Sequence, residues 1–411
     1  MLNSLVQTAR GVARAEFLCA NRGRARVILA VAAVAISAIL SGCATAPLSN
    51  QPASLLRDEL FVDSKQTIDV GAVFRMNDAM RNYLDGDVAQ EMRKKGAVQG
   101  LYDALYSKHE LKLDYDAAET RTASEAFDAR SGNCLSLVIM TAAIAKALEL
   151  NVYFQSVAVD ENWLRKDDLY FYSGHVNVTI GRKRPTVRFG YESGHLLTID
   201  FTPLSSDGDL KVRPITEATV LAMYMNNRAA EMLAVGKTRQ AYWWVREAIL
   251  QDAAFLPSYN TLAIVYRRSG YAMHAEAPLR HVLERDSANV PALSNTVLVL
   301  RDLGKHSESE TASANLKRIV PFEPYHFFRQ AQLAMKEKNF RTARDLFARE
   351  VNRQPFNHEF HFALAMAHFA LGETEKAIRH LSIAGETSVT RQQQGIYAAK
   401  LERLRTASRT Q

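Results

Sequence analysis

The chain is poor in cysteine, in long apolar runs and in excess charge. Its 411 residues include three cysteines: Cys19, Cys43 and Cys134. The apolar run 27–40 is shorter than the ~20 residues that a membrane-spanning helix needs. The net charge is +7, and residues 1–42 contribute +4 of it through five Arg and one Glu. The remaining +3 gives little support to a polyanion partner, so we expect no nucleic-acid binding.

Motifs for bound metals and nucleotides are also missing. The sequence has no Cys/His spacing typical of a zinc site, no glycine-rich phosphate loop and no acidic calcium loop. We therefore expect no metal and no cofactor.

Residues 1–42 are typical of an export signal, because five arginines precede an apolar run. The run ends in Leu40-Ser41-Gly42-Cys43, which resembles the lipobox of bacterial lipoproteins. This resemblance implies cleavage before Cys43 and lipid, such as palmitate, on that residue. Ala44, rather than Asp, follows it and by the same resemblance implies the outer membrane, with the protein facing the periplasm. The alternative is an uncleaved anchor helix.

Cleavage at this point would remove Cys19 and leave Cys134 as the single free thiol. A lone thiol in an oxidising compartment is open to damage, and structural cysteines there usually pair. Cys134 is then either a small buried apolar residue or a nucleophile. A histidine and an aspartate later in the chain favour the nucleophile.

The mature chain has the length of two domains. Residues 43–69 are mostly polar, which predicts a flexible tether. Helical periodicity begins near Val73, and Thr122 with Glu125 fits a capping box. The patterns then predict a buried helix over 135–150 and strands over 152–159, 169–180, 186–191 and 196–201. Residues 70–213 are therefore expected to form an α+β domain.

From residue 214 to 411 the strand pattern stops and a repeat takes over. Gly236, Gly270 and Gly304 are 34 residues apart, and the same step reaches Lys338 and Gly372. Mostly small residues recur seven positions before these points and five after: Ala229, Ala263, Val297, Ala331 and Ala365, then Ala241, Ala275, Ser309, Ala343 and Ala377. The third unit is irregular, because Ser309 and Ser313 stand where other units have alanine and apolar residues.

This period resembles that of tetratricopeptide repeats, in which small residues let paired helices approach and stacked hairpins share one core. Five units and a C-terminal helix near 389–404 are expected to form an all-α solenoid. By resemblance, its groove would hold a protein partner. Trp243 and Trp244 are interpreted as packing residues, because adjacent helical side chains point about 100° apart.

The candidate site begins at Cys134, the expected first residue of the apolar helix. Gly132 is expected to allow a tight entry turn, and unpaired N–H groups at the helix start favour a thiolate. His175, within a strand pattern, can accept the thiol proton, and Asp200 can hold the second imidazole nitrogen. His195 also lies near Asp200 but falls in a predicted turn, so His175 is preferred. The backbone N–H of Cys134 is the first candidate oxyanion donor. The second is open between Tyr115, Asn133 and Trp163.

Three motifs together resemble the transglutaminase-like superfamily of papain-like cysteine enzymes. They are a Gly-x-Cys opening a helix, a Gly-His on a strand and a strand ending in Asp-x-Thr: Gly132-Asn133-Cys134, Gly174-His175 and Asp200-Phe201-Thr202. The resemblance covers about residues 70–205. It implies acyl transfer from an amide through a thioester, with Cys134 as nucleophile, His175 as base and Asp200 orienting the imidazole. Animal members usually have tryptophan near the Cys and the Asp, where this chain has Leu135 and Phe201, so the substrate class does not carry over.

Three functions remain open. The first is a cysteine hydrolase or transamidase acting on a protein or peptide. The second is a peptidoglycan endopeptidase, whose usual Asp-Cys-Ser-Gly differs from Asn133-Cys134-Leu135-Ser136. The third is a catalytically inactive, lipid-anchored scaffold that acts through its repeats. Thiol reactivity separates the first from the third, and cleavage of cell wall or of protein separates the first from the second.

Overall fold

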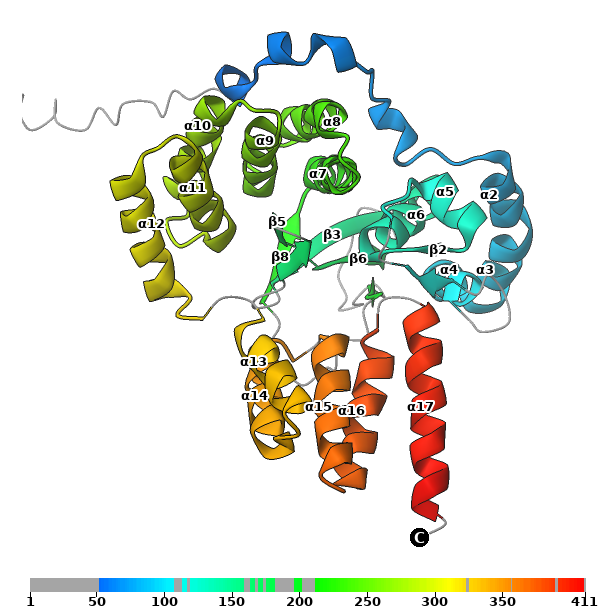
Figure 1. The fold of residues 1–411 in the computed structure, drawn as a ribbon. Helices are drawn as coiled ribbons and strands as arrows, with labels where there is room; N and C mark the ends of the chain where they lie inside the picture. Colours follow the sequence, from blue (N-terminus) through cyan, green and yellow to red (C-terminus); the bar gives the residue numbers. More distant parts are fainter. Residues whose placement is uncertain are drawn as a thin grey trace, which may run out of the picture. The chain divides into compact units, whose positions relative to one another are not determined.

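An α+β region is followed by a stacked array of helices (Figure 1). The computed structural model describes residues 52–106, 113–116, 119–158, 163–166, 169–172, 175–181, 196–201, 211–322, 325–355, 357–388 and 391–409. The expected export signal 1–42 and the expected lipid-bearing Cys43 lie outside these residues. Within the described ranges, no helix combines the length and hydrophobicity that a bilayer span needs.

Short 3₁₀ turns make up the first described segment: η2 (Pro52–Leu55), η3 (Asp58–Leu60), η4 (Val62–Ser64) and η5 (Val70–Ala72). The expectation of a flexible tether over 43–69 is wrong for much of this part, because Leu55 and Phe61 are buried in one core with repeat helices. The polar composition predicted a flexible segment, but two buried apolar residues are enough to anchor it.

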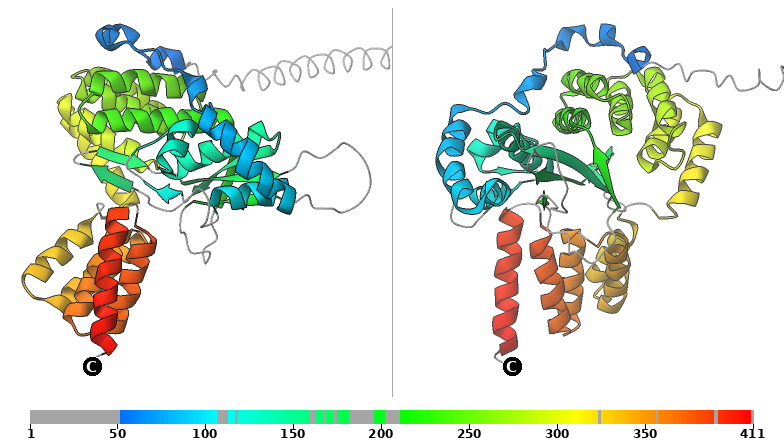
Figure 2. Two further views of the ribbon diagram at one scale, coloured as in Figure 1. Left: turned by 90° about the vertical axis from the view of Figure 1, so that its right-hand side faces the viewer. Right: turned by 180° about the vertical axis from the view of Figure 1, so that it is seen from behind.

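Helices form the first layer of the α+β region. They are α2 (Asp78–Tyr83), the π-helical turn η6 (Leu84–Val88), α3 (Ala89–Lys95), α4 (Ala97–Tyr106), α5 (Ala123–Ala129) and α6 (Cys134–Ala147). The capping box predicted at Thr122 and Glu125 is confirmed at the start of α5. The predicted buried helix is confirmed as α6, whose residues 135–145 are all buried. Figure 2 shows α6 alongside the sheet, with which it shares a core.

Four antiparallel strands form the main sheet in the order β7-β6-β3-β8. The strands are β3 (Asn151–Ala158), β6 (His175–Gly181), β7 (Leu197–Ile199) and β8 (Lys211–Ile215). Two small sheets accompany it: β1 (Asp114–Tyr115) with β2 (Ser131–Gly132), which are parallel, and β4 (Trp163–Lys166) with β5 (Leu169–Tyr172), which are antiparallel.

The strand predictions hold in part. β3 and β7 match two expected strands, whereas the expected strand 169–180 is two separate strands, β5 and β6. The strand expected over 186–191 lies outside the described residues. β4 and β8 were not predicted, and β8 carries the sheet to Ile215, past the expected boundary at 213. Pro214 is tolerated there because β8 is an edge strand, where a missing N–H costs little.

Paired helices build the second region. They are α7 (Glu217–Ala234), α8 (Thr238–Gln251), α9 (Leu256–Arg268), α10 (Ala272–Leu283), α11 (Val290–Asp302), α12 (His306–Ile319), α13 (His326–Lys336), α14 (Phe340–Arg353), α15 (His358–Ala370), α16 (Thr374–Glu386) and α17 (Arg391–Arg409). The predicted register is confirmed, because the five points 34 residues apart all have positive φ between 61° and 83°. Lys338 takes this left-handed conformation without the freedom of glycine.

The predicted irregularity of the third unit is also visible. Of α12, only Ser309 and Ala312 are buried. Ser309 Oγ donates to the carbonyl of Val297 at 3.0 Å, which satisfies a hydroxyl in an alanine position. The buried cores of α7–α10 and of α13–α15 are separate clusters.

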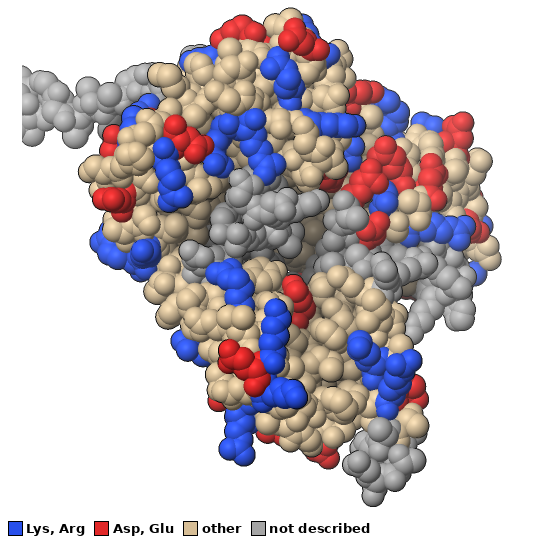
Figure 3. Space-filling view, viewed as in Figure 1, with Lys and Arg blue, Asp and Glu red and all other residues tan. Residues whose placement is uncertain are grey.

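Charge on the described surface is mixed. On the face drawn in Figure 3, basic and acidic side chains are interspersed over the coloured residues. This distribution agrees with the small excess of positive charge in the sequence.

Candidate functional site

Cys134 occupies the first position of α6, as the sequence predicts, and its thiol is free and partly exposed. Asn133 caps this helix: its side-chain oxygen accepts from the Ser136 backbone N–H at 2.9 Å and from the Ser136 hydroxyl at 2.8 Å. The first N–H groups of a helix have no acceptor within it. The Asn133 side chain caps the N–H of Ser136 and not that of Cys134. The N–H of Cys134 therefore remains our prediction for the first oxyanion donor.

Gly132 is needed for space rather than for a turn. Its φ is not positive, so the expected tight entry turn does not explain this glycine. A Cβ at Gly132 would lie 2.6 Å from the Cβ of Ser136, closer than side-chain atoms pack. The backbone before Cys134 therefore passes directly against the first turn of α6.

Strand pairing brings His175 and Asp200 to the same place. β6 and β7 pair with Val178 opposite Ile199, and continuing this register puts Asp200 opposite Asn177. His175 and Asn177 share a strand face, so His175 is a diagonal neighbour of Asp200. The two side chains meet, with His175 Nε2 2.7 Å from Asp200 Oδ1. This contact leaves Nδ1 of His175 for another partner.

The Cys134 side chain interacts with the same buried imidazole, which is 5% exposed. Burial by itself lowers the pKa of His175, but the interactions with Asp200 and Cys134 outweigh it and raise the pKa to about 9. The structure thus brings His175 and Asp200 into contact, and the Cys134 side chain acts on the same imidazole.

Asp200 is partly exposed, and its neighbour in the chain packs against α4. Its side chain is 33% exposed, and the next residue, Phe201, packs against Tyr106 of α4 with ring centroids 5.2 Å apart. Asn177 lies buried on β6, the strand of His175, and its side-chain oxygen accepts no hydrogen bond from any described residue. Sequence reasoning did not single out Asn177, which in isolation reads as an ordinary strand residue.

Thr120 was also missed, although it connects the start of α6 with the first repeat helix. Its hydroxyl accepts from the Asn133 side-chain amide at 2.9 Å and from the Asn227 amide of α7 at 3.3 Å. The Thr120 backbone N–H donates to Glu231 of α7 at 2.7 Å. This bond uses one of the two N–H groups of the Asn133 amide, so Asn133 stays open, with Tyr115 and Trp163, as the second oxyanion donor.

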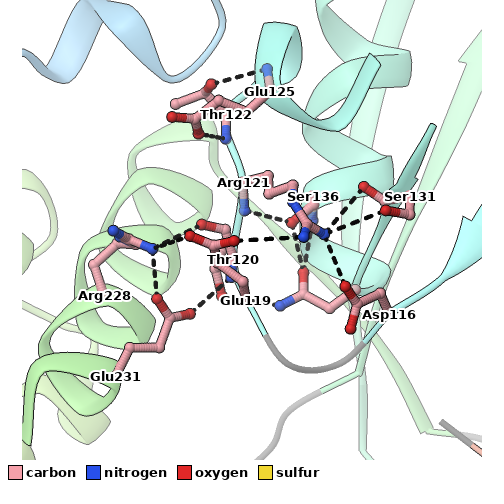
Figure 4. Close-up of polar contacts among 11 residues, drawn as sticks. Asp116, Glu119, Thr120, Arg121, Thr122, Glu125, Ser131, Ser136, Arg228 and Glu231 are labelled. Carbon is pink, nitrogen blue, oxygen red and sulfur yellow. Dashed lines mark hydrogen bonds and ion pairs between the residues drawn. The ribbon is translucent and has the colours of Figure 1, made fainter. Parts of the chain in front are cut away.

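Charged groups surround this connection (Figure 4). Arg228 of α7 donates to Glu231 at 2.6 Å and to the Thr120 carbonyl at 3.4 Å. Burial raises the pKa of Glu231 although Arg228 and Thr120 act against it. On the other side, Arg121 contacts Asp116 at 3.1 Å, and its backbone N–H donates to the Ser136 hydroxyl at 2.8 Å.

Other predicted residues cannot be placed. His195 lies outside the described residues, as do Cys19 and Cys43, and nothing is described of the side chains of Tyr115 and Trp163. Within the described parts of the chain, no three His, Cys, Asp or Glu side chains gather in a way that could hold a metal ion.

No protein-family model and no curated protein matches this sequence. Several solved structures are similar to less than half of the chain. A MamA variant is 20% identical over 41% of this chain and 97% of its own, with a TM-score of 0.23. Pseudomonas aeruginosa PilF is 17% identical over 44% of this chain and 91% of its own, with a TM-score of 0.24. YrrB, described as a TPR protein with an unusual peptide-binding site, is 16% identical over 44% and 92%, with a TM-score of 0.24.

Proposed function

We propose that this chain is a lipoprotein of the bacterial outer membrane, anchored through Cys43 and facing the periplasm, with a thiol acyl-transfer site. Cys134 is the nucleophile, His175 the base and Asp200 the residue that orients the imidazole. The substrate is an amide of a protein or peptide. The repeats recruit that substrate or a protein partner, as the tetratricopeptide type of array implies.

One arrangement supports this proposal: a thiol at a helix start acts on a buried imidazole, and Nε2 of that imidazole lies 2.7 Å from a carboxylate. A structural histidine needs no such thiol partner. A carboxylate on one imidazole nitrogen fixes the tautomer and stabilises the imidazolium. The helix start adds N–H groups that favour negative charge on sulfur.

The chemistry follows from these positions. The Cys134 thiol gives its proton to His175, and the sulfur attacks the amide carbonyl carbon to form a tetrahedral oxyanion facing the N–H of Cys134. His175 then returns the proton to the leaving amine as the C–N bond breaks, which leaves a thioester. Water or a second amine attacks the thioester, His175 takes the incoming proton, and the sulfur leaves and regains it. Water gives hydrolysis, and an amine gives transamidation.

The first test is the pH dependence of alkylation of Cys134 by iodoacetamide in residues 44–411. An ordinary thiol ionises near pH 8.5. We expect the wild-type thiol to react at pH 6.5 at least about 10-fold faster than in His175→Ala, because a neighbouring imidazolium stabilises the thiolate. The advantage should vanish as pH rises through about 9, where His175 loses its proton.

His306→Ala is the matched control, since His306 is an exposed histidine at the start of α12. Asp200→Asn should give an intermediate rate at pH 6.5. Equal rates in wild type and His175→Ala at that pH would defeat the enzyme proposal. The chain would then be a lipid-anchored scaffold that acts through its repeats.

A further inference from the structure

A segment before the α+β region lies on the first repeats as a bound peptide would. Residues 54–64, the N-terminal segment (blue in Figure 1), form short 3₁₀ turns and pack against α8 and α9. Phe61 is fully buried and stacks on Tyr242 of α8, with ring centroids 4.0 Å apart and planes within 5°. Leu55 is the second buried anchor.

Side chains of the repeat helices form hydrogen bonds with the backbone of this segment. Three donate to its carbonyls: Tyr266 Oη to Leu55 at 2.7 Å, Arg239 Nη2 to Leu60 at 3.0 Å and Trp243 Nε1 to Phe61 at 3.3 Å. A fourth, the Tyr242 hydroxyl, accepts from the Arg57 N–H at 2.8 Å. Bonds to backbone groups hold any segment in this shape, whatever its sequence, so the side-chain anchors must provide selectivity.

An acidic side chain provides the polar part of that selectivity. Asp58 accepts from Arg246 Nε with both oxygens at 2.9 Å, and from the Tyr242 hydroxyl at 2.7 Å. Phe61 follows Asp58 by three residues and occupies the aromatic site between Tyr242 and Tyr271. Leu56 and Leu60 are partly buried and pack against the same core, whereas Val62 is 60% exposed. The specific polar and aromatic contacts therefore come from an aspartate and a phenylalanine at fixed spacing.

We propose that α8–α10 form a binding surface for peptides that adopt short 3₁₀ turns and have aspartate three residues before phenylalanine, and that the N-terminal segment is its built-in, exchangeable occupant. While the segment is bound, the surface is closed to partners. A partner segment of the same chemistry binds when the segment leaves. This inference does not depend on catalysis at Cys134.

The test uses the chain from residue 44 onward and a fluorescent synthetic peptide of residues 54–64. Phe61→Ala in the protein removes the main anchor and should free the surface. We expect the labelled peptide to bind this variant at least about 10-fold more tightly than it binds wild type, measured by fluorescence anisotropy. Val62→Ala in the protein is the matched control and should behave as wild type, because Val62 is exposed.

Peptide variants test the recognition rule. Phe61→Ala and Asp58→Asn in the peptide should each weaken its binding to the Phe61→Ala protein by 10-fold or more. Asp58→Asn in the protein serves as a second, milder variant should Phe61→Ala unfold, and it should also increase binding. Equal binding to wild type and to the folded variants, or binding to none of them, would overturn the proposal.

Discussion

At the scale of single residues, Thr120 connects the start of α6 with the first repeat helix. One hydroxyl accepts from two amides, one beside Cys134 and one in α7, and Thr120 itself is buried. The cap of the helix that carries the thiol is thereby tied to the first repeat. The position of Cys134 thus depends on a residue outside the candidate triad.

Thr120→Val should lower the free energy of unfolding by about 0.5–1.5 kcal/mol, because valine keeps the shape and removes the acceptor of two half-buried amides. It should also slow alkylation of Cys134 at pH 6.5, since the start of α6 loses its support. Urea unfolding and iodoacetamide kinetics measure the two effects. Thr120→Ser, which keeps the hydroxyl, should restore most of both. A valine variant as stable and as reactive as wild type would contradict this role.

The sequence could predict the candidate triad but not the role of Thr120. Cys134, His175 and Asp200 each stand in a short motif, and the order of the motifs carries information. Thr120 has no motif, and its bond with Asn227 joins residues 107 positions apart. Asn177 is hidden for a similar reason, because only the register of β6 and β7 shows that it lies opposite Asp200.

At the scale of elements, α15 and α16 carry a cluster of three histidines, of which His361 and His368 are buried and His380 is half-buried. His361 donates from Nε2 to the Pro355 carbonyl at 2.8 Å, and its Nδ1 lies 3.0 Å from Nδ1 of His380. His368 stacks on His380 with parallel rings. Burial, and then the charge of His361 and His368, lower the pKa of His380 to about 4.

This pKa makes the pair of helices sensitive to acid. An unfolded histidine binds a proton near pH 6.5, whereas His380 in the folded pair resists it, so stability falls as pH drops from about 6.5 to 4. We expect a lower melting temperature at pH 4.5 than at pH 7, followed by circular dichroism, and a smaller difference in His380→Gln. His306→Gln should behave as wild type. An unchanged difference in His380→Gln would show that other groups control the acid response.

The sequence predicted the repeat helices better than the short strands, for a physical reason. The repeat register follows from left-handed turns every 34 residues, which favour glycine at four of five points. β4 and β8 have four and five residues, and β8 includes a proline, so neither gives a strand pattern in the sequence. Their strand conformation depends on pairing partners rather than on local preference.

At the scale of the whole molecule, the apolar core is divided. The core around α6 and the sheet extends into α7 and α8, whereas the core of α13–α15 contains no buried residue from earlier elements. Among the described residues, the buried cluster around α6 therefore extends no further than Ala248 of α8. The sequence indicated a weak third repeat at Ser309 and Ser313, but not where the core would divide.

A chain truncated after Val320 should keep its candidate site. We expect residues 44–320 to show alkylation rates at Cys134 within about 2-fold of those of residues 44–411 across the pH range, because each core through α12 stays whole. The fraction of helix should fall only by the loss of α13–α17. A truncated chain that aggregates or loses its low-pH reactivity would mean that the last helices support the α+β region.

The packed N-terminal segment also sets how much free chain can lie between the proposed lipid anchor and the repeats. With lipid on Cys43, as proposed, only residues 44–53 lie between the membrane anchor and the first residue held on the repeats. Ten extended residues reach at most about 36 Å, whereas a free chain through residue 69 would reach about 90 Å. Docking of Phe61 thus keeps the first repeats close to the bilayer surface, and its release would more than double the radius in which the thiol can search for an amide.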